Sequence, residues 1–150
     1  CELLCMVRCE KMKNWILTAI GLVGGFISSL FGGWTASLTT LIICMAVDYI
    51  TGLIVAGVFH KSPKTENGSL ESRAGFKGLL RKFTILFFVL IGHRLDLATG
   101  FSYIRDAVCI FFVCNECLSI IENAILMGVP VPPVIRKALG KLQGKEEDNT

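Results

Sequence analysis

The residues of this sequence that could do chemistry lie inside apolar stretches. Asp48 stands near the middle of the stretch 34–60, and Glu116 and Glu122 stand in the stretch 104–127. Carboxylates at such depth are costly in a membrane and mark ion or proton paths when they occur. Cys114-Asn-Glu-Cys117 has the C-x-x-C spacing of a thiol oxidoreductase. The chemistry to consider is therefore ion or proton transport, or disulfide exchange.

The setting of the cysteine pair argues against disulfide exchange. A reactive thiolate needs an electropositive and partly exposed setting, and two carboxylates, Glu116 and Glu122, lie beside the cysteine pair instead. Both alternatives, a membrane thiol oxidoreductase using Cys114 and Cys117 and a small ion or proton carrier, stay open at this point. We see no glycine-rich phosphate loop, catalytic triad or metal cluster, so we expect no catalytic residue, no cofactor and no metal. The net charge of +3 is small and gives no indication of a nucleic-acid partner.

The elements that hold these residues are long and apolar. The chain has 150 residues, of which 53% are hydrophobic and 18% are charged, against about 25% charged in ordinary globular proteins. About 20 apolar residues cross a bilayer as a helix. The sequence therefore predicts an all-α integral membrane protein with four transmembrane helices in one domain, residues 13–145. The expected spans are residues 15–33, 36–59, 83–101 and 104–127.

Three parts of this assignment stay open or lie outside the domain. Residues 1–12 are a leader of uncertain status, and residues 146–150 form an acidic tail. The stretch 83–101 carries polar side chains in its second half, so whether it fully spans is not decided by its composition.

Polar side chains inside the spans are expected to face the interior of the bundle or water. Arg94 lies at nearly the depth of Asp48 in a four-span arrangement, so the two are a candidate buried pair. The full set of expected intramembrane polar residues is Asp48, Arg94, Asp96, Asn115, Glu116, Glu122 and Asn123.

Small residues form a second pattern, in the first span. Gly21, Gly25, Ser29 and Gly33 recur every four residues and so share one helix face. Such a face lets two membrane helices approach closely. We expect it to serve self-association into a homo-oligomer, and we expect Gly52, four residues after Asp48, to serve helix packing as well.

Basic residues set the expected orientation. All lysines and arginines except Arg94 and Arg105 fall before the first span, between the second and third, or after the fourth. Basic residues near helix ends mark the cytoplasmic side, so both termini are predicted to be cytoplasmic.

The central loop and the segment after the fourth span each contain an amphipathic stretch. In the loop, the basic residues Arg73, Lys77, Arg81 and Lys82 predict a short helix lying on the membrane surface. A cytoplasmic extension of the next span is the alternative. The stretch 134–143 predicts a second short amphipathic helix.

With these elements in place, three motifs resemble one known family. They are Asp48-Tyr-Ile-Thr-Gly52, the run Arg73-Ala-Gly-Phe-Lys-Gly-Leu-Leu-Arg-Lys82, and Asn115-Glu-Cys-Leu-Ser-Ile-Ile-Glu-Asn123 followed by Gly128-Val-Pro-Val-Pro132. In this order and spacing they resemble the toxin-secretion/phage-lysis holin family of Gram-positive phages. The resemblance implies a protein of the bacterial cytoplasmic membrane that oligomerises in the lipid bilayer and opens lesions. A cytosolic endolysin or toxin would leave through them, without needing direct contact with the protein.

Overall fold

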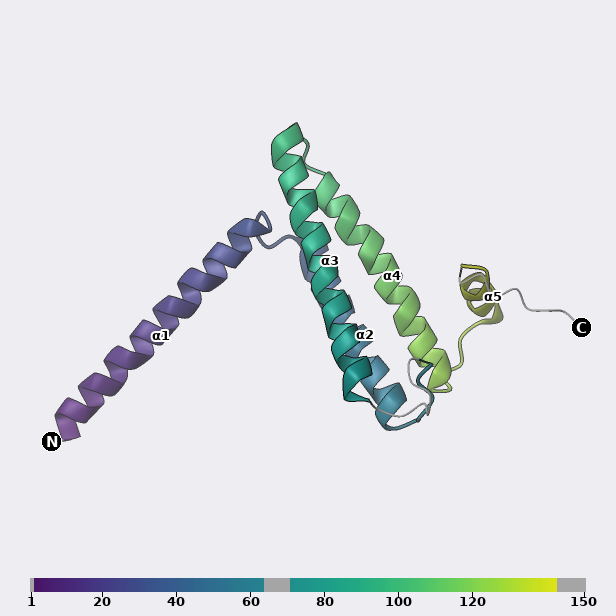
Figure 1. The fold of residues 1–150 in the computed structure, drawn as a ribbon, viewed down its shortest axis with the longest axis horizontal. Coiled ribbons are helices and arrows are strands. Elements are labelled where there is room, and N and C mark those ends of the chain that lie inside the picture. Colours follow the sequence, from purple (N-terminus) through teal and green to yellow (C-terminus); the bar gives the residue numbers. More distant parts are fainter. Residues whose placement is uncertain (1, 64–70, 143–150) are drawn as a thin grey trace, which may run out of the picture.

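The computed structural model describes residues 2–63 and 71–142, and within these ranges the chain forms helices joined by turns and short connections, without strands (Figure 1). The five helices are α1 (Glu2–Leu30), α2 (Ala36–Gly57), α3 (Ser72–Thr99), α4 (Ile104–Leu126) and α5 (Pro133–Leu142). The all-α fold predicted from the sequence is confirmed for the described residues.

Helices α2, α3 and α4 form a three-helix bundle. Successive helices reverse direction, so α2 and α4 run parallel and α3 runs antiparallel to both (Figure 1). The buried core of one half of the bundle is apolar and draws on all three helices: Leu38, Leu41, Met45, Ile85, Val89 and Cys109. This half contains the start of α2 and α4, and we call it the outer half. The other half, which contains the end of α2 and α4, is the inner half.

Two glycines make the turn between α1 and α2. Gly32 and Gly33 have φ values of +73° and +88°. This is a left-handed backbone conformation that residues other than glycine adopt only at a cost in free energy. A Cβ on Gly32 would lie 2.6 Å from Nδ1 of His93 and 2.7 Å from Nη1 of Arg105, whereas a Cβ on Gly33 would meet nothing within 4 Å. Gly32 is therefore required both by its backbone and by the close approach of α3 and α4.

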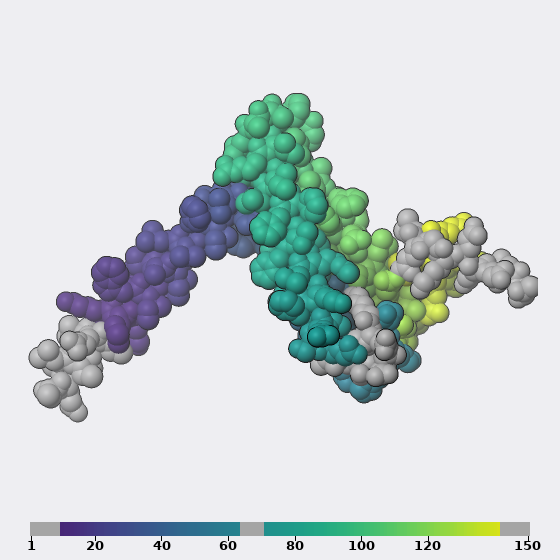
Figure 2. Space-filling view, in the orientation of Figure 1, coloured from purple at the N-terminus to yellow at the C-terminus, as the bar shows by residue number. Residues whose placement is uncertain are grey.

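Helix α1 projects away from the bundle as a separate arm (Figures 1 and 2). Every residue from 10 to 27 is exposed, including Trp15 and Leu22. The helix begins at Glu2 and continues through Met12 without a break, so its helical part starts earlier than the expected span.

Three of the four expected spans are helices long and apolar enough to cross a membrane. They are Glu10–Leu30, Ala36–Gly57 and Ile104–Leu126, with 21, 22 and 23 residues. Helix α3 has the length, with 28 residues, but it carries charged residues towards both ends and is not in this group. The four-span topology thus remains a prediction.

The two expected amphipathic helices have different outcomes. Helix α5 follows the fourth span as a short separate helix, as predicted. The separate helix expected in the central loop is wrong, because its residues form the first turns of α3, which runs unbroken from Ser72 to Thr99. The alternative, an extension of the next helix, is what the structure shows.

Candidate functional site

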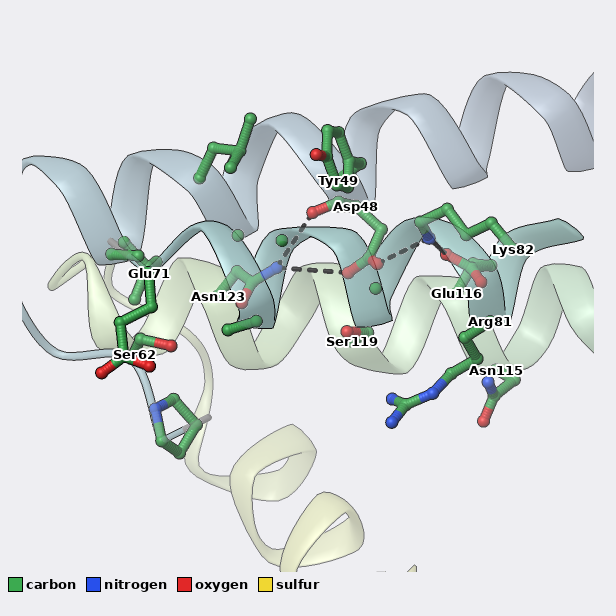
Figure 3. A pocket seen from close by; sticks show the side chains of 18 residues that line it. Asp48, Tyr49, Ser62, Glu71, Arg81, Lys82, Asn115, Glu116, Ser119 and Asn123 are labelled. Atoms are coloured by element: carbon green, nitrogen blue, oxygen red, sulfur yellow. Dashed lines mark hydrogen bonds and ion pairs between the residues drawn. The ribbon is translucent and has the colours of Figure 1, made fainter. Parts of the chain in front are cut away.

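A cluster of three charged side chains joins the three helices of the bundle near their middle. Nζ of Lys82, on α3, lies 2.8 Å from Oδ2 of Asp48 on α2 and 2.5 Å from Oε2 of Glu116 on α4. The side chains of Lys82, Asp48 and Glu116 are only 12%, 11% and 5% exposed. Figure 3 shows the ammonium group of Lys82 held between the two carboxylates. With two carboxylates and one ammonium group, the charge cluster has a formal charge of −1 when all three are ionised.

An amide extends this cluster towards the inner half. Nδ2 of Asn123 donates to Oδ1 of Asp48 at 3.2 Å (Figure 3). The same nitrogen donates to Oγ1 of Thr51 at 3.0 Å. Gly52 lies beside it, and a Cβ there would be 3.8 Å from the same amide nitrogen. The motif D-x-x-T-G therefore brings an acid, a hydroxyl and a small residue to one place on α2, where α4 can reach them.

The predicted pair of Asp48 with Arg94 is wrong. Asp48 binds Lys82, while Arg94 is exposed twelve residues further along α3, or about 18 Å at 1.5 Å per residue. The sequence prediction started the third span at residue 83, which left Lys82 on the membrane surface and made Arg94 the nearest cation. Because α3 starts at Ser72 instead, Lys82 enters the bundle.

A sequence signal for Lys82 exists and was missed. The buried residues of α3 are Ile85, Val89, Gly92 and Asp96, and Lys82 precedes them at the same alternating spacing of three and four. This is the pattern of one helix face. Applied to a helix that begins before residue 82, it places Lys82 in the buried row.

A hollow connects the charge cluster with the inner end of the bundle. Its volume is about 110 Å³, and it extends from Ser62 and Glu71 at the inner end to Asp48, Lys82 and Asn115. A single buried water needs about 10–15 Å³ by this measure. The hollow therefore has room for several waters, and the polar side chains in its lining, such as Lys82 and Asn115, would hold them.

Asp96 and Arg105 belong to a second polar group, at the outer end. The carboxylate of Asp96 accepts hydrogen bonds from the backbone N–H groups of Ile104 (2.8 Å) and Arg105 (3.0 Å), so it caps the start of α4. Nη1 of Arg105 donates to the carbonyl oxygens of Phe31 and Gly32, both at 3.0 Å. Asp96, predicted to face the bundle interior or water, is buried at this end of the bundle, and the sequence predicts no role for Arg105.

The remaining predicted site residues lie outside these two groups, and of them Asn115 and Arg81 border the hollow. Asn115 is exposed and Glu122 is half-buried. A Cβ on Gly21, Gly25 or Gly33 would meet nothing within 4 Å, and Ser29 is exposed. This small-residue face of α1 therefore packs against no other helix of the described chain. The basic residues Arg73, Lys77 and Arg81 are exposed, as are Cys114 and Cys117.

Comparisons with known proteins identify the family. The family model of the bacteriophage holin family matches residues 25–144. An uncharacterized protein of Halalkalibacterium halodurans is 35% identical over 143 residues, which cover 91% of this chain and 98% of that protein. A 14.9 kDa uncharacterized protein of Clostridium perfringens is 33% identical over 139 residues, 91% of this chain and 99% of that protein.

A phage protein is among the relatives. A probable holin of Bacillus phage phi105 is 28% identical over 114 residues, covering 75% of this chain and 78% of that protein. No solved structure matches the chain. The match over most of the chain confirms the resemblance drawn from the three motifs, and the protein belongs to the bacteriophage holin family.

Proposed function

We propose that the protein is a holin that oligomerises in the bacterial cytoplasmic membrane and forms lesions through which a cytosolic endolysin or toxin leaves the cell. Membership of the family suggests a membrane protein without enzymatic activity. The observation that carries the proposal is a charged, hollow interior in a bundle whose outer surface is largely apolar. Asp48, Lys82 and Glu116 are buried, whereas large apolar side chains such as Ile43, Phe87 and Ile110 are exposed.

The proposal includes four spans with both termini in the cytoplasm. Ser37 of α2 donates to Asp106 of α4 at the outer end, and Asn123 of α4 donates to Asp48 and Thr51 of α2 further inward. Helices α2 and α4 would therefore span the membrane in the same direction. The chain must return across the bilayer between them, and α3, at 28 residues, has the length to do so.

An ion or proton carrier is the second candidate, and one specific observation favours it. The hollow leads from the inner end of the bundle to the carboxylates of Asp48 and Glu116, as a path for a proton or small cation would. A carrier would pass ions but no protein, and this difference separates the two functions.

The test is induced expression in a bacterium that also makes a cytosolic endolysin. A holin should abolish the membrane potential, measured with a voltage-sensitive dye, and then cause abrupt lysis. The control is a strain without the endolysin, which should lose its potential but not lyse. Loss of potential without release of the endolysin would favour the carrier, and an intact potential at high expression would contradict both functions.

A further inference from the structure

The inner halves of α3 and α4 carry polar side chains on the outside of the bundle. Arg81 and Asn115 are both exposed, and both border the hollow together with Ser119. Figure 3 shows Arg81 and Asn115 projecting away from α2, whereas their neighbours Lys82 and Glu116 turn inward. Lys77 lies one turn before Arg81, and Glu122 lies two turns after Asn115, so each continues the same row. We call Lys77, Arg81, Asn115, Ser119 and Glu122 the polar face.

This face lies deep in the proposed membrane region. Asn115 is eleven residues from either end of α4, or about 16 Å at 1.5 Å per residue. Arg81 is at the same depth, because the next residue, Lys82, bonds Glu116. Charged and amide side chains at mid-bilayer face protein or water and not acyl chains. The polar face therefore needs a polar surrounding.

Helix α1 cannot supply the polar groups that the polar face needs, whether α1 comes from this chain or from a second copy. Residues 11–30 contain no aspartate or glutamate, so that part of α1 cannot neutralise Arg81 or Lys77. Water fits better, because the hollow already connects Asn115 and Arg81 with the inner end of the bundle at Ser62 and Glu71.

We infer that the polar face lines the aqueous lumen of the lesion, with water and small ions against Arg81, Asn115 and Ser119. The inference rests on the proposed permeabilising function and adds which surface of each subunit turns towards the lumen. The small-residue face of α1 and the apolar sides of α2 and α4 then remain for contact with other subunits and lipid.

Cysteine labelling tests the inference, and the chain supplies its own control. Cys117 is exposed and lies two residues after Asn115, so the two differ in depth by about 3 Å and point about 200° apart around the helix. The background replaces all cysteines except the buried Cys109 with serine. Three variants are made in this background, each with a single exposed thiol. Two carry a polar-face cysteine, Asn115→Cys or Ser119→Cys, and the third restores the native Cys117.

The probe is a membrane-impermeant, charged methanethiosulfonate, which reacts with thiols in water. It is added to cells whose potential has collapsed, and modification is followed by mass spectrometry. We expect both polar-face thiols to react at least tenfold faster than the thiol of Cys117, with the Cys109 background unmodified.

Two results would count against the inference in different ways. If cells are permeabilised but the polar-face thiols react as slowly as Cys117, the face is a dry contact between subunits and the inference is wrong, while the proposed function stands. If the wild-type protein does not permeabilise the membrane, the proposed function fails and the inference fails with it.

Discussion

Replacing Lys82 with methionine is the sharpest test of the charge cluster. Methionine keeps an unbranched, flexible side chain of similar length but removes the ammonium group that bonds both Asp48 and Glu116. The two carboxylates then share a site that is almost closed to solvent, without the cation between them. The formal charge of the cluster becomes −2.

The expected loss of unfolding free energy follows from the costs of two alternative states of the variant. Leaving one charge of a buried pair without its partner costs about 3–5 kcal/mol. The variant can instead protonate one carboxylate, which for a glutamate costs about 3.7 kcal/mol at pH 7 and about 1.4 kcal/mol less for each pH unit below that. We therefore expect Lys82→Met to lose about 3–4 kcal/mol of unfolding free energy at pH 7. Because acid supplies the proton that the folded variant needs, its deficit relative to wild type should shrink by about 2 kcal/mol at pH 5.5.

The assay is equilibrium unfolding in detergent micelles, followed by helical circular dichroism. Arg94→Gln is the matched control, since Arg94 is an exposed cation on the same helix and its loss should change stability by less than about 0.5 kcal/mol. A triple variant, Asp48→Asn with Lys82→Met and Glu116→Gln, removes all three charges and should be more stable than Lys82→Met alone. If Lys82→Met loses no more stability than Arg94→Gln, or if its deficit does not depend on pH, the buried charge cluster does not stabilise the bundle as described.

Three further predictions concern the turn after α1, its small-residue face and the topology. Gly32→Ala should lower the unfolding free energy more than Gly33→Ala, by at least about 1 kcal/mol. Both glycines have positive φ, but only a Cβ at Gly32 would overlap His93 and Arg105, so equal losses would contradict this prediction. Gly25→Leu should leave membrane insertion intact but reduce crosslinked oligomers and delay lysis, while unchanged crosslinking would remove that face from self-association. Reporter fusions after residues 64 and 145 should both be active in the cytoplasm, and activity of either fusion only outside would rule out four spans.

Much of the architecture follows from the sequence because apolar length is a local property. The helices α2 and α4 end within about two residues of the predicted spans, since the chain switches there from apolar residues to glycine, proline or charge. Glu116 and Asn123 were expected to face the bundle interior or water with the other polar residues of the spans, and both are buried. The family could be recognised from the three motifs quoted above, since two of them combine rare intramembrane polar residues at fixed spacing.

Which charges meet depends on how the helices pack against one another. The sequence placed Asp48 at mid-membrane, but its partner depended on where α3 starts and on the register of α3 against α2. Beginning at Ser72 brings Lys82 to the level of Asp48 and Glu116, and it leaves Arg94 exposed. Likewise, Asp96 caps α4 because the turn at Gly100 folds α4 back onto it. Hydrophobicity fixes how long a helix is, whereas the pairing of buried charges depends on helix register, which is set by packing between segments far apart in the chain.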